Sequence, residues 1–336
     1  MKISASVYSN KDKSLETIVK ELDHNQVDYF HIDCLDDLSV FEDIEKIKAI
    51  SKVPADLHII SSDAKKFFPH IEKVAPAYVS FQFEDLQEVP AMPKIPHVKF
   101  GLAISSDTDI EVFDQFQHDF HHILIMTTTP GKSGGVFNKE NFEKIRKFKK
   151  KYPNKKVHVD GGVNDEISFI LRNLGVDLIV SGSFLVNAES VGSALISLKN
   201  EEVASHYRIK DFMHSLAETP IIEENSLTLK NTLTYIEDYD LGYVLISDKD
   251  GVLTGLISNA DIRKGLLRNI DKDLNQLDVK SFINRNPIFI HQDRTIDEML
   301  KLIKSKNFPI SYLPVVDKDK KISGTVQFFN LIKGES

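Results

Sequence analysis

The sequence has few of the features that mark secreted, membrane-embedded or nucleic-acid-binding proteins. Cys34 is the single cysteine, so no disulfide can form within the chain, as is usual in a reducing compartment. No apolar run approaches the roughly 20 residues of a transmembrane helix, and the N-terminus lacks the apolar segment of a signal peptide. The 42 basic and 50 acidic residues give a net charge of -8 without a basic stripe. We therefore expect a cytoplasmic protein that binds neither a membrane nor nucleic acid.

The length of the chain and its hydrophobic periodicity indicate the fold. With 336 residues, of which 41% are hydrophobic, about two domains are expected. Up to residue 199, short β-rich runs alternate with helical patterns; the runs are 3–8, 29–34, 55–60, 78–83, 98–104, 123–127, 156–159 and 178–180. The clearest amphipathic stretches are 14–22, 41–50 and 141–148, whereas prolines in 84–96 leave only a weak helix signal there. This alternation predicts an α/β fold, a (β/α)8 TIM barrel, over residues 1–199.

Four polar residues occur at the C-terminal ends of these runs, where the active site of such a barrel lies. His31 and Asp33 are two positions apart in one strand and therefore project to the same face. His58 follows Asp56 in the next strand, and Asp160 ends the seventh. Two imidazoles and two carboxylates suit Zn²⁺, Fe²⁺ or Mn²⁺. We predict that His31, Asp33, His58 and Asp160 bind one divalent metal ion, which would polarise a substrate oxygen.

Other polar residues of this region have simpler interpretations. His118, His121 and His122 predict a solvated loop, and His158 is better explained as a packed or hydrogen-bonded residue than as a ligand. Cys34 should face the surrounding helices and be inert, because it alternates with the residues that project into the barrel.

Seven segments, in order along the chain, resemble the ribulose-phosphate 3-epimerase family. They are 5–6, 31–36, 56–58, 101–104, 125–131, 159–163 and 180–183. The resemblance covers essentially the whole predicted barrel. It implies a metal-dependent epimerase that removes a proton beside the carbonyl group of a ketose phosphate and returns one on the opposite face.

The resemblance also assigns roles to individual residues. Asp33 and Asp160 would be metal ligands and, in addition, the catalytic base and acid. Backbone groups at the glycines after the seventh and eighth strands would hold the phosphate, and segment 130–135 would close as a lid. Gly161 and Gly162 could equally form only a tight turn. The substrate-binding residues implied are Ser6, His58, Met126, Gly131, Gly134, Gly161, Gly162, Gly182 and Ser183.

The chain departs from the family pattern around the expected substrate. Leu35 and Ile60 occupy positions that are usually methionine, and Gln82 stands where a histidine is frequent. The loop after Asp36 and the lid residue Lys132 also differ. Ribulose 5-phosphate and xylulose 5-phosphate are the favoured substrate pair. The alternatives are another ketose phosphate, such as allulose 6-phosphate, and a non-catalytic sensor of phosphosugars or nucleotides.

From residue 219 the sequence contains an internal repeat of about 68 residues. Segments 220–222, 226–233, 244–251 and 255–258 correspond to 287–289, 293–300, 313–320 and 324–327. Each copy predicts a strand, a helix, a hairpin and a final helix, and residues 200–218 predict a helical linker. The repeat resembles a tandem pair of CBS (cystathionine-β-synthase-type) domains, an α+β regulatory module, at 219–336.

The CBS resemblance implies a nucleotide site in the first repeat. Ser258 and Asp261 match the ribose-binding residues of the family, so adenine or another nucleotide is an expected ligand. The same two residues could equally form a capping box at a helix start. Gln327 and Asn330 replace them in the second repeat, which favours one nucleotide, or a dimer-forming role with none. Because both families commonly self-associate, we expect a homo-oligomer.

Overall fold

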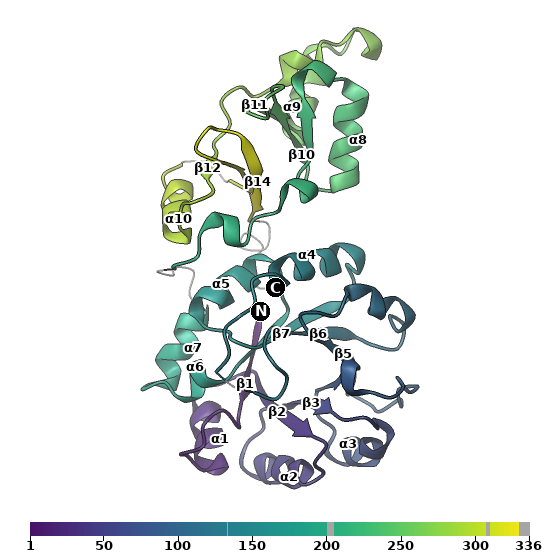
Figure 1. The fold of residues 1–336 in the computed structure, drawn as a ribbon, viewed down its shortest axis with the longest axis vertical. Coiled ribbons are helices and arrows are strands. Elements are labelled where there is room, and N and C mark those ends of the chain that lie inside the picture. Colours follow the sequence, from purple (N-terminus) through teal and green to yellow (C-terminus); the bar gives the residue numbers. More distant parts are fainter. Residues whose placement is uncertain (133, 200–204, 307–309, 329–336) are drawn as a thin grey trace. The chain divides into compact units, whose positions relative to one another are not determined.

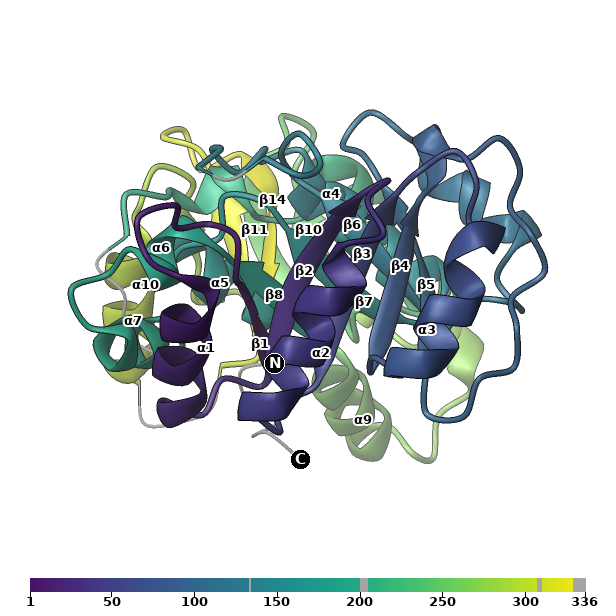
Figure 2. The same cartoon turned by 90° about the horizontal axis from the view of Figure 1, so that it is seen from below.

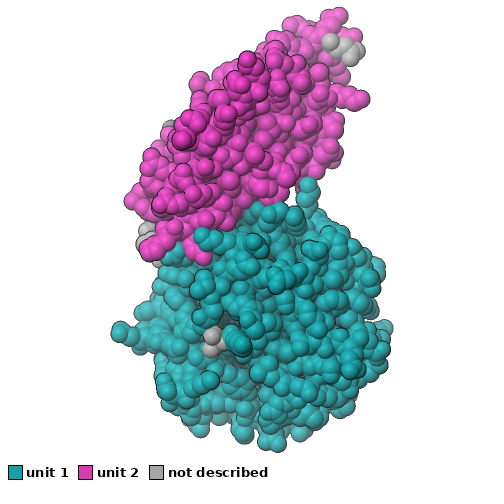
Figure 3. All heavy atoms as spheres, in the orientation of Figure 1, with its two compact units in different colours: residues 1–203, 334–336 teal, residues 204–333 magenta. Residues whose placement is uncertain are grey.

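The computed structural model describes residues 1–132, 134–199, 205–306 and 310–328. The chain forms two compact units that divide after residue 203 (Figure 3). Among the helices of the described residues, none combines the length and the hydropathy needed to cross a bilayer.

The first unit is a closed barrel of eight strands, as predicted. All neighbouring strands are parallel and follow the order of the sequence, and β8 pairs with β1 to close the barrel. The predicted runs match the strands to within a residue or two at either end. The strands are β1 (Lys2–Ser6), β2 (Tyr29–Leu35), β3 (Ala55–Ile60), β4 (Tyr78–Gln82), β5 (Lys99–Ile104), β6 (His122–Met126), β7 (Lys156–Asp160) and β8 (Leu178–Ser181).

Helices surround this barrel on the outside (Figures 1 and 2). They are α1 (Leu15–His24), α2 (Val40–Ile50), α3 (Phe68–Val74), α4 (Asn141–Lys151), α5 (Asp165–Asn173), α6 (Ser183–Val186) and α7 (Val191–Lys199). The side chain of Ser14 caps α1 by accepting a hydrogen bond from the backbone N–H of Thr17, and Ile18 and Leu22 on one face are buried. The proline-rich connection after β4 contains only the 3-10 turn Phe83–Asp85, which agrees with its weak helix signal.

The predicted solvated loop at His122 was wrong, because β6 begins at this residue. The His122 imidazole is fully buried in the barrel and stacks on His158, with ring centroids 4.2 Å apart. On the neighbouring strand, a Cβ atom at Gly101 would lie 2.2 Å from His122 Nε2, so the glycine provides the space for the ring. His121 is partly buried, and only His118 is exposed. The run of polar residues around His122 could not reveal this space, because the space is left by a glycine on a different strand.

The second unit contains two three-stranded sheets, one from each sequence repeat, as expected for a CBS pair. The first repeat forms β9 (Ile221–Glu223), α8 (Leu229–Tyr239), β10 (Tyr243–Ser247), β11 (Leu253–Ser258) and α9 (Asn259–Arg268). The second forms β12 (Ile290–His291), α10 (Ile296–Lys304), β13 (Tyr312–Val316) and β14 (Ile322–Gln327). Its expected final helix, with Asn330, lies outside the described residues. The repeats share a hydrophobic core in which Tyr243 and Leu256 pack with Val316 and Ile322.

The described part of the predicted helical linker contains two short 3-10 turns, Ile209–Asp211 and Leu216–Glu218, and no α-helix. Residues 200–204 lie outside the described residues. The Ile209 N–H donates a hydrogen bond to the carbonyl of Arg294 at 2.9 Å, and His214 forms a β-bridge with Thr325. Segment 205–218 is therefore packed on the second repeat.

Candidate metal and substrate site

The strand register of the barrel brings the four predicted metal ligands together. His31 on β2 is paired with Ser6 on β1, and Asp33 is paired with His58 on β3. Asp160 is the last residue of β7. Each of His31, Asp33, His58 and Asp160 offers one ligand atom, and these atoms all lie within 4.8 Å of one another. This spacing is compatible with one ion at the centre of the cluster.

The surroundings of His31 indicate that the cluster suits a cation. Its Nδ1 lies 2.9 Å from the Oδ2 atom of Asp56, which also accepts a hydrogen bond from Ser4 Oγ. Its Nε2 is buried without a hydrogen-bond partner among the described residues and lies 3.5 Å from carboxylate oxygens of both Asp33 and Asp160. Burial opposes a charge on His31, but Asp56 and Asp33 outweigh it and raise the pKa of the imidazole well above its ordinary value. The site therefore favours positive charge where a metal ion would sit.

His58 is held on its two sides by different groups. Its Nδ1 lies 3.1 Å from Asp33 Oδ1, within the cluster, and its Nε2 lies 2.8 Å from the Oε1 atom of Gln82. Both His58 and Gln82 are fully buried. The ring is thus fixed with Nδ1 directed at the proposed metal position.

The two carboxylates of the cluster differ in their affinity for a proton. Burial opposes ionisation of Asp33, but hydrogen bonds with His31 and His58 hold the pKa of its carboxyl well below the ordinary value. Burial raises the pKa of Asp160 to about 6, with a further contribution from the charge of Asp33. Carboxylates whose pKa values are separated in this way can act as a base and an acid at the same pH.

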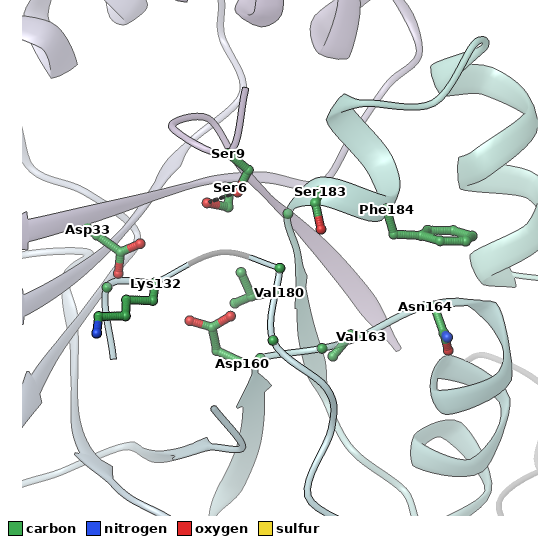
Figure 4. A pocket seen from close by; sticks show the side chains of 16 residues that line it. Ser6, Ser9, Asp33, Lys132, Asp160, Val163, Asn164, Val180, Ser183 and Phe184 are labelled. Carbon is green, nitrogen blue, oxygen red and sulfur yellow. Dashed lines mark hydrogen bonds between the residues drawn. The ribbon is translucent and has the colours of Figure 1, made fainter. Parts of the chain in front are cut away.

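A cavity of ≈ 350 Å³ is lined by two members of the cluster, Asp33 and Asp160 (Figure 4). Asp33 and Asp160 both point into it, and the Ser9 hydroxyl donates a hydrogen bond to Ser6 Oγ at its edge (Figure 4). Its lining residues are Ser6, Ser9, Asp33, Gly131, Lys132, Gly134, Gly135, Asp160, Gly161, Gly162, Val163, Asn164, Val180, Gly182, Ser183 and Phe184. Most of the predicted substrate-binding residues therefore line one space.

Comparison with known proteins identifies the family of the barrel. A family model described as the ribulose-phosphate 3 epimerase family matches residues 2–186, which is more than half of the chain. The chain belongs to the ribulose-phosphate 3-epimerase family. Its family places it among the isomerases, as an epimerase that acts on carbohydrates.

Curated members of the family match over nearly their whole length. The ribulose-phosphate 3-epimerase of Methanocaldococcus jannaschii is 27% identical over 226 residues, covering 63% of this chain and 95% of that protein. The Bacillus subtilis enzyme is 24% identical over 216 residues, covering 60% of this chain and all of that protein. The enzyme of Helicobacter pylori strain J99 is 28% identical over 213 residues, covering 60% and 97%.

Two predicted substrate-binding residues of the family pattern do not line the cavity. Met126 is buried in a small cluster with Ala103 and Leu124, and His58 is a buried member of the four predicted metal ligands. Conversely, Ser9 and Asn164 line the cavity although the sequence analysis did not select them. Asn164 had a local signal, because an Asn before a helical pattern is a typical N-cap, and its side chain caps α5.

Gly162 is compatible with both interpretations of the Gly161-Gly162 pair, a tight turn and a backbone that a phosphate can approach. Its φ of 62° is in the left-handed region, and a Cβ atom there would lie 2.4 Å from the backbone nitrogen of Phe137. The chain itself therefore requires a glycine for this turn. The same glycine lines the cavity, where the lack of a side chain leaves the backbone accessible to a ligand.

The start of the predicted lid is close to two residues at which the sequence analysis expected a departure from the family pattern. Gly131 lies against the side chains of Leu35 and Ile60. Lys132, which follows, is a cationic residue of the cavity wall (Figure 4). Of the departures noted in the sequence, Lys132 lines the cavity, and Leu35 and Ile60 lie beside Gly131 at the start of the predicted lid.

In the second unit, Ser258 and Asp261 form the capping box that was one of their two interpretations. Ser258 accepts a hydrogen bond from the Asp261 N–H, and Asp261 Oδ2 accepts from the backbone N–H of Ser258 at 2.9 Å and from its hydroxyl at 2.6 Å. The pair therefore stabilises the start of α9. Its role toward a nucleotide remains a prediction.

A CBS-domain family model matches residues 279–334. Similar solved structures include CBSX2 from Arabidopsis thaliana, which is 20% identical, covers 38% of this chain and 94% of that chain, and has a TM-score of 0.32. A structure of CBSX2 in complex with AMP is 21% identical, with the same coverage and a TM-score of 0.31.

Proposed function

We propose that the barrel is a divalent-metal-dependent 3-epimerase that interconverts ribulose 5-phosphate and xylulose 5-phosphate. The observation that carries this proposal is the combination of a four-ligand cluster with two carboxylates, Asp33 and Asp160, that point into one cavity and have separated pKa values. The names of the curated relatives support the same substrate pair.

The ligand set consists of His31 Nε2, His58 Nδ1 and one oxygen each of Asp33 and Asp160. A divalent ion bound there supplies positive charge that stabilises the enediolate oxygens of the substrate. This set of donor atoms, two imidazole nitrogens and two carboxylate oxygens, suits Zn²⁺, Fe²⁺ or Mn²⁺.

The proton transfers are assigned to the two carboxylates. Asp33, which is ionised, accepts the proton from C3 of the ketose phosphate, and the electron pair of the broken C–H bond enters the C2–C3 enediolate. Asp160, whose raised pKa of about 6 makes it the stronger proton carrier of the two, donates a proton to the opposite face of C3 from its protonated form. In the reverse direction the two residues exchange roles. The reaction is a net isomerisation, and no redox cofactor is needed.

The phosphate group is assigned to the side of the cavity formed by the glycines after β7 and β8. Gly161, Gly162 and Gly182 line this side with Ser183, so that backbone groups can approach the phosphate closely. The segment that begins at Gly131 is assigned the role of a lid that excludes water from the enediolate. Ser6 is assigned a hydrogen bond to the substrate near C3.

The decisive test is hydrogen exchange in D₂O. The metal-loaded protein should exchange the C3 proton of ribulose 5-phosphate, and a chelator should abolish the exchange. Allulose 6-phosphate, tested in parallel, measures whether the altered lid and loop select another ketose phosphate. Failure to exchange a proton of any ketose phosphate tested would favour a non-catalytic sensor.

Asp160→Asn tests the assignment of the acid. The variant should lose about 10²–10⁴-fold in turnover because it removes the proton carrier. It should remain folded, because the volume of the side chain is unchanged. Asp119→Asn, at an exposed position outside the cavity, is the matched control and should retain activity. An active Asp160→Asn variant would refute the role of this residue.

For the CBS pair we propose regulation by an adenine or other nucleotide, bound in part by Ser258 and Asp261. The family match and the hydroxyl–carboxylate pair at the start of α9 support this proposal. A nucleotide present at 100 times its Kd should stabilise the folded protein by about 2.7 kcal/mol in a thermal-shift assay. A response that persists after Ser258→Ala and Asp261→Ala together would place the site elsewhere.

A further inference from the structure

Beyond the metal cluster, a hydrogen-bonded chain extends from His58 through two residues that the proposed reaction does not use. His58 Nε2 lies 2.8 Å from Gln82 Oε1, and Gln82 Nε2 donates a hydrogen bond to Glu84 Oε2 at 2.5 Å. Gln82 is fully buried. The chain therefore connects the cluster to the loop that follows β4.

The two oxygens of Glu84 have separate partners. Oε1 accepts hydrogen bonds from the backbone N–H of Ser105 at 2.8 Å and from the hydroxyl of Thr108, whereas Oε2 accepts from Gln82. Desolvation raises the pKa of Glu84, but these hydrogen bonds outweigh it and hold the pKa below its ordinary value. Glu84 is thus an ionised group that can only accept hydrogen bonds.

This division of partners determines the orientation of the Gln82 amide. Because Glu84 Oε2 can only accept, the end of the amide that faces it must be the NH₂ group. The carbonyl end then faces His58, where it can only accept a hydrogen bond. His58 must therefore carry its proton on Nε2, which leaves the lone pair of Nδ1 free to bind a metal ion.

We propose that Glu84 is a positioning residue which, through the Gln82 amide, fixes His58 as the Nε2–H tautomer required for metal binding by Nδ1. This inference rests on the metal site of the proposed function. His31 is held in the opposite sense, since the acceptor Asp56 lies at its Nδ1 and leaves Nε2 free. Opposite nitrogens of the two rings are thereby presented to one ion.

The test uses two variants: one replaces the carboxylate of Glu84 with an amide, and the other exchanges the amide of Gln82 with the carboxylate of Glu84. In Glu84→Gln, Ser105 and Thr108 hold the amide oxygen of residue 84, so its NH₂ group faces the NH₂ group of Gln82. Gln82 must then turn and present its NH₂ group to His58 Nε2. In the double variant Gln82→Glu, Glu84→Gln, residue 82 is again an acceptor for His58, and residue 84 donates to it. The double variant has the same net charge as the natural chain.

Zn²⁺ affinity, measured by competition with a chromophoric chelator, is the first readout. Glu84→Gln should bind Zn²⁺ about 10–100-fold more weakly than the natural chain, as is typical for loss of a partner of a metal-binding histidine. The double variant should recover most of this loss. Glu88→Gln is the matched control, because Glu88 lies on the same connection and forms an exposed ion pair with Lys65, away from Gln82 and His58. Unchanged affinity in Glu84→Gln, or a double variant that binds no better than it, refutes the proposal.

The second readout is measured first on the natural chain, so its main result does not depend on whether a variant folds. Long-range ¹H–¹⁵N spectra of the Zn²⁺-loaded natural chain should show the proton of His58 on Nε2 and that of His31 on Nδ1. The reverse pattern at His58 overturns the proposal. In Glu84→Gln the His58 resonances should shift while those of His31 stay unchanged. Neither readout uses a substrate, so both are independent of whether the proposed epimerase reaction is correct.

Discussion

Acidification should destabilise the barrel through the buried pair of histidines on β6 and β7. His158 is 2% exposed, stacks on His122 and contacts the edge of the Tyr78 ring at a centroid distance of 4.8 Å. Burial, with a smaller contribution from the charge of His121, lowers the pKa of His158 to about 3. Burial likewise lowers the pKa of His122 well below its ordinary value. Both rings are therefore neutral in the folded protein at pH values where the unfolded chain would bind protons.

The sign and size of the effect follow from the two states of His158. In the unfolded chain its pKa is about 6.5, so the unfolded state binds a proton as the pH falls through this value. The folded state binds it only near pH 3. Stability is therefore lost progressively as the pH falls from about 6.5, and at pH 5 the loss from His158 is about 2 kcal/mol. His122 acts in the same direction.

The assay is urea unfolding at pH 7 and pH 5, followed by circular dichroism with a chelator present. His158→Phe keeps an aromatic ring in the stack but cannot bind a proton, so its stability should fall less between the two pH values than that of the natural chain, by about 2 kcal/mol. His118→Phe, at an exposed position, is the control and should leave the pH dependence unchanged. The reasoning is refuted if His158→Phe and the natural chain lose the same stability on acidification.

Three further variants test individual contacts. Asp56→Asn should weaken Zn²⁺ binding about 10–100-fold by chelator competition, because it weakens the acceptor that holds His31; unchanged affinity would contradict this role. Gly162→Ala should lower the free energy of unfolding by about 1–3 kcal/mol in urea, because it adds a Cβ atom at a positive φ close to Phe137, and an unaffected stability would argue against the tight turn. Ser258→Ala should cost about 1 kcal/mol in the thermal stability of the second unit through loss of the cap, whereas a neutral change would show that the cap contributes little.

The site could be predicted in part because strand geometry is local. The two-residue spacing of His31 and Asp33 places both on one face of β2, and the position of Asp160 at the end of a run places it at the mouth of a barrel. The contribution of Glu84 and Gln82 could not be found in this way. Their effect depends on which atom of each side chain faces which neighbour, and sequence spacing carries no information on that orientation.

The sequence by itself determined the alternation of strands and helices, the repeat in the C-terminal half and the residue types of the His–Asp cluster at the strand ends, since these depend on periodicities along the chain. The tertiary structure alone decided that His122 is buried, because the space for its ring is left by Gly101 on a neighbouring strand. It also decided which nitrogen of each metal-site histidine faces the cluster. Both outcomes are set by side chains far apart in sequence that barrel closure brings into contact, so no local pattern could specify them.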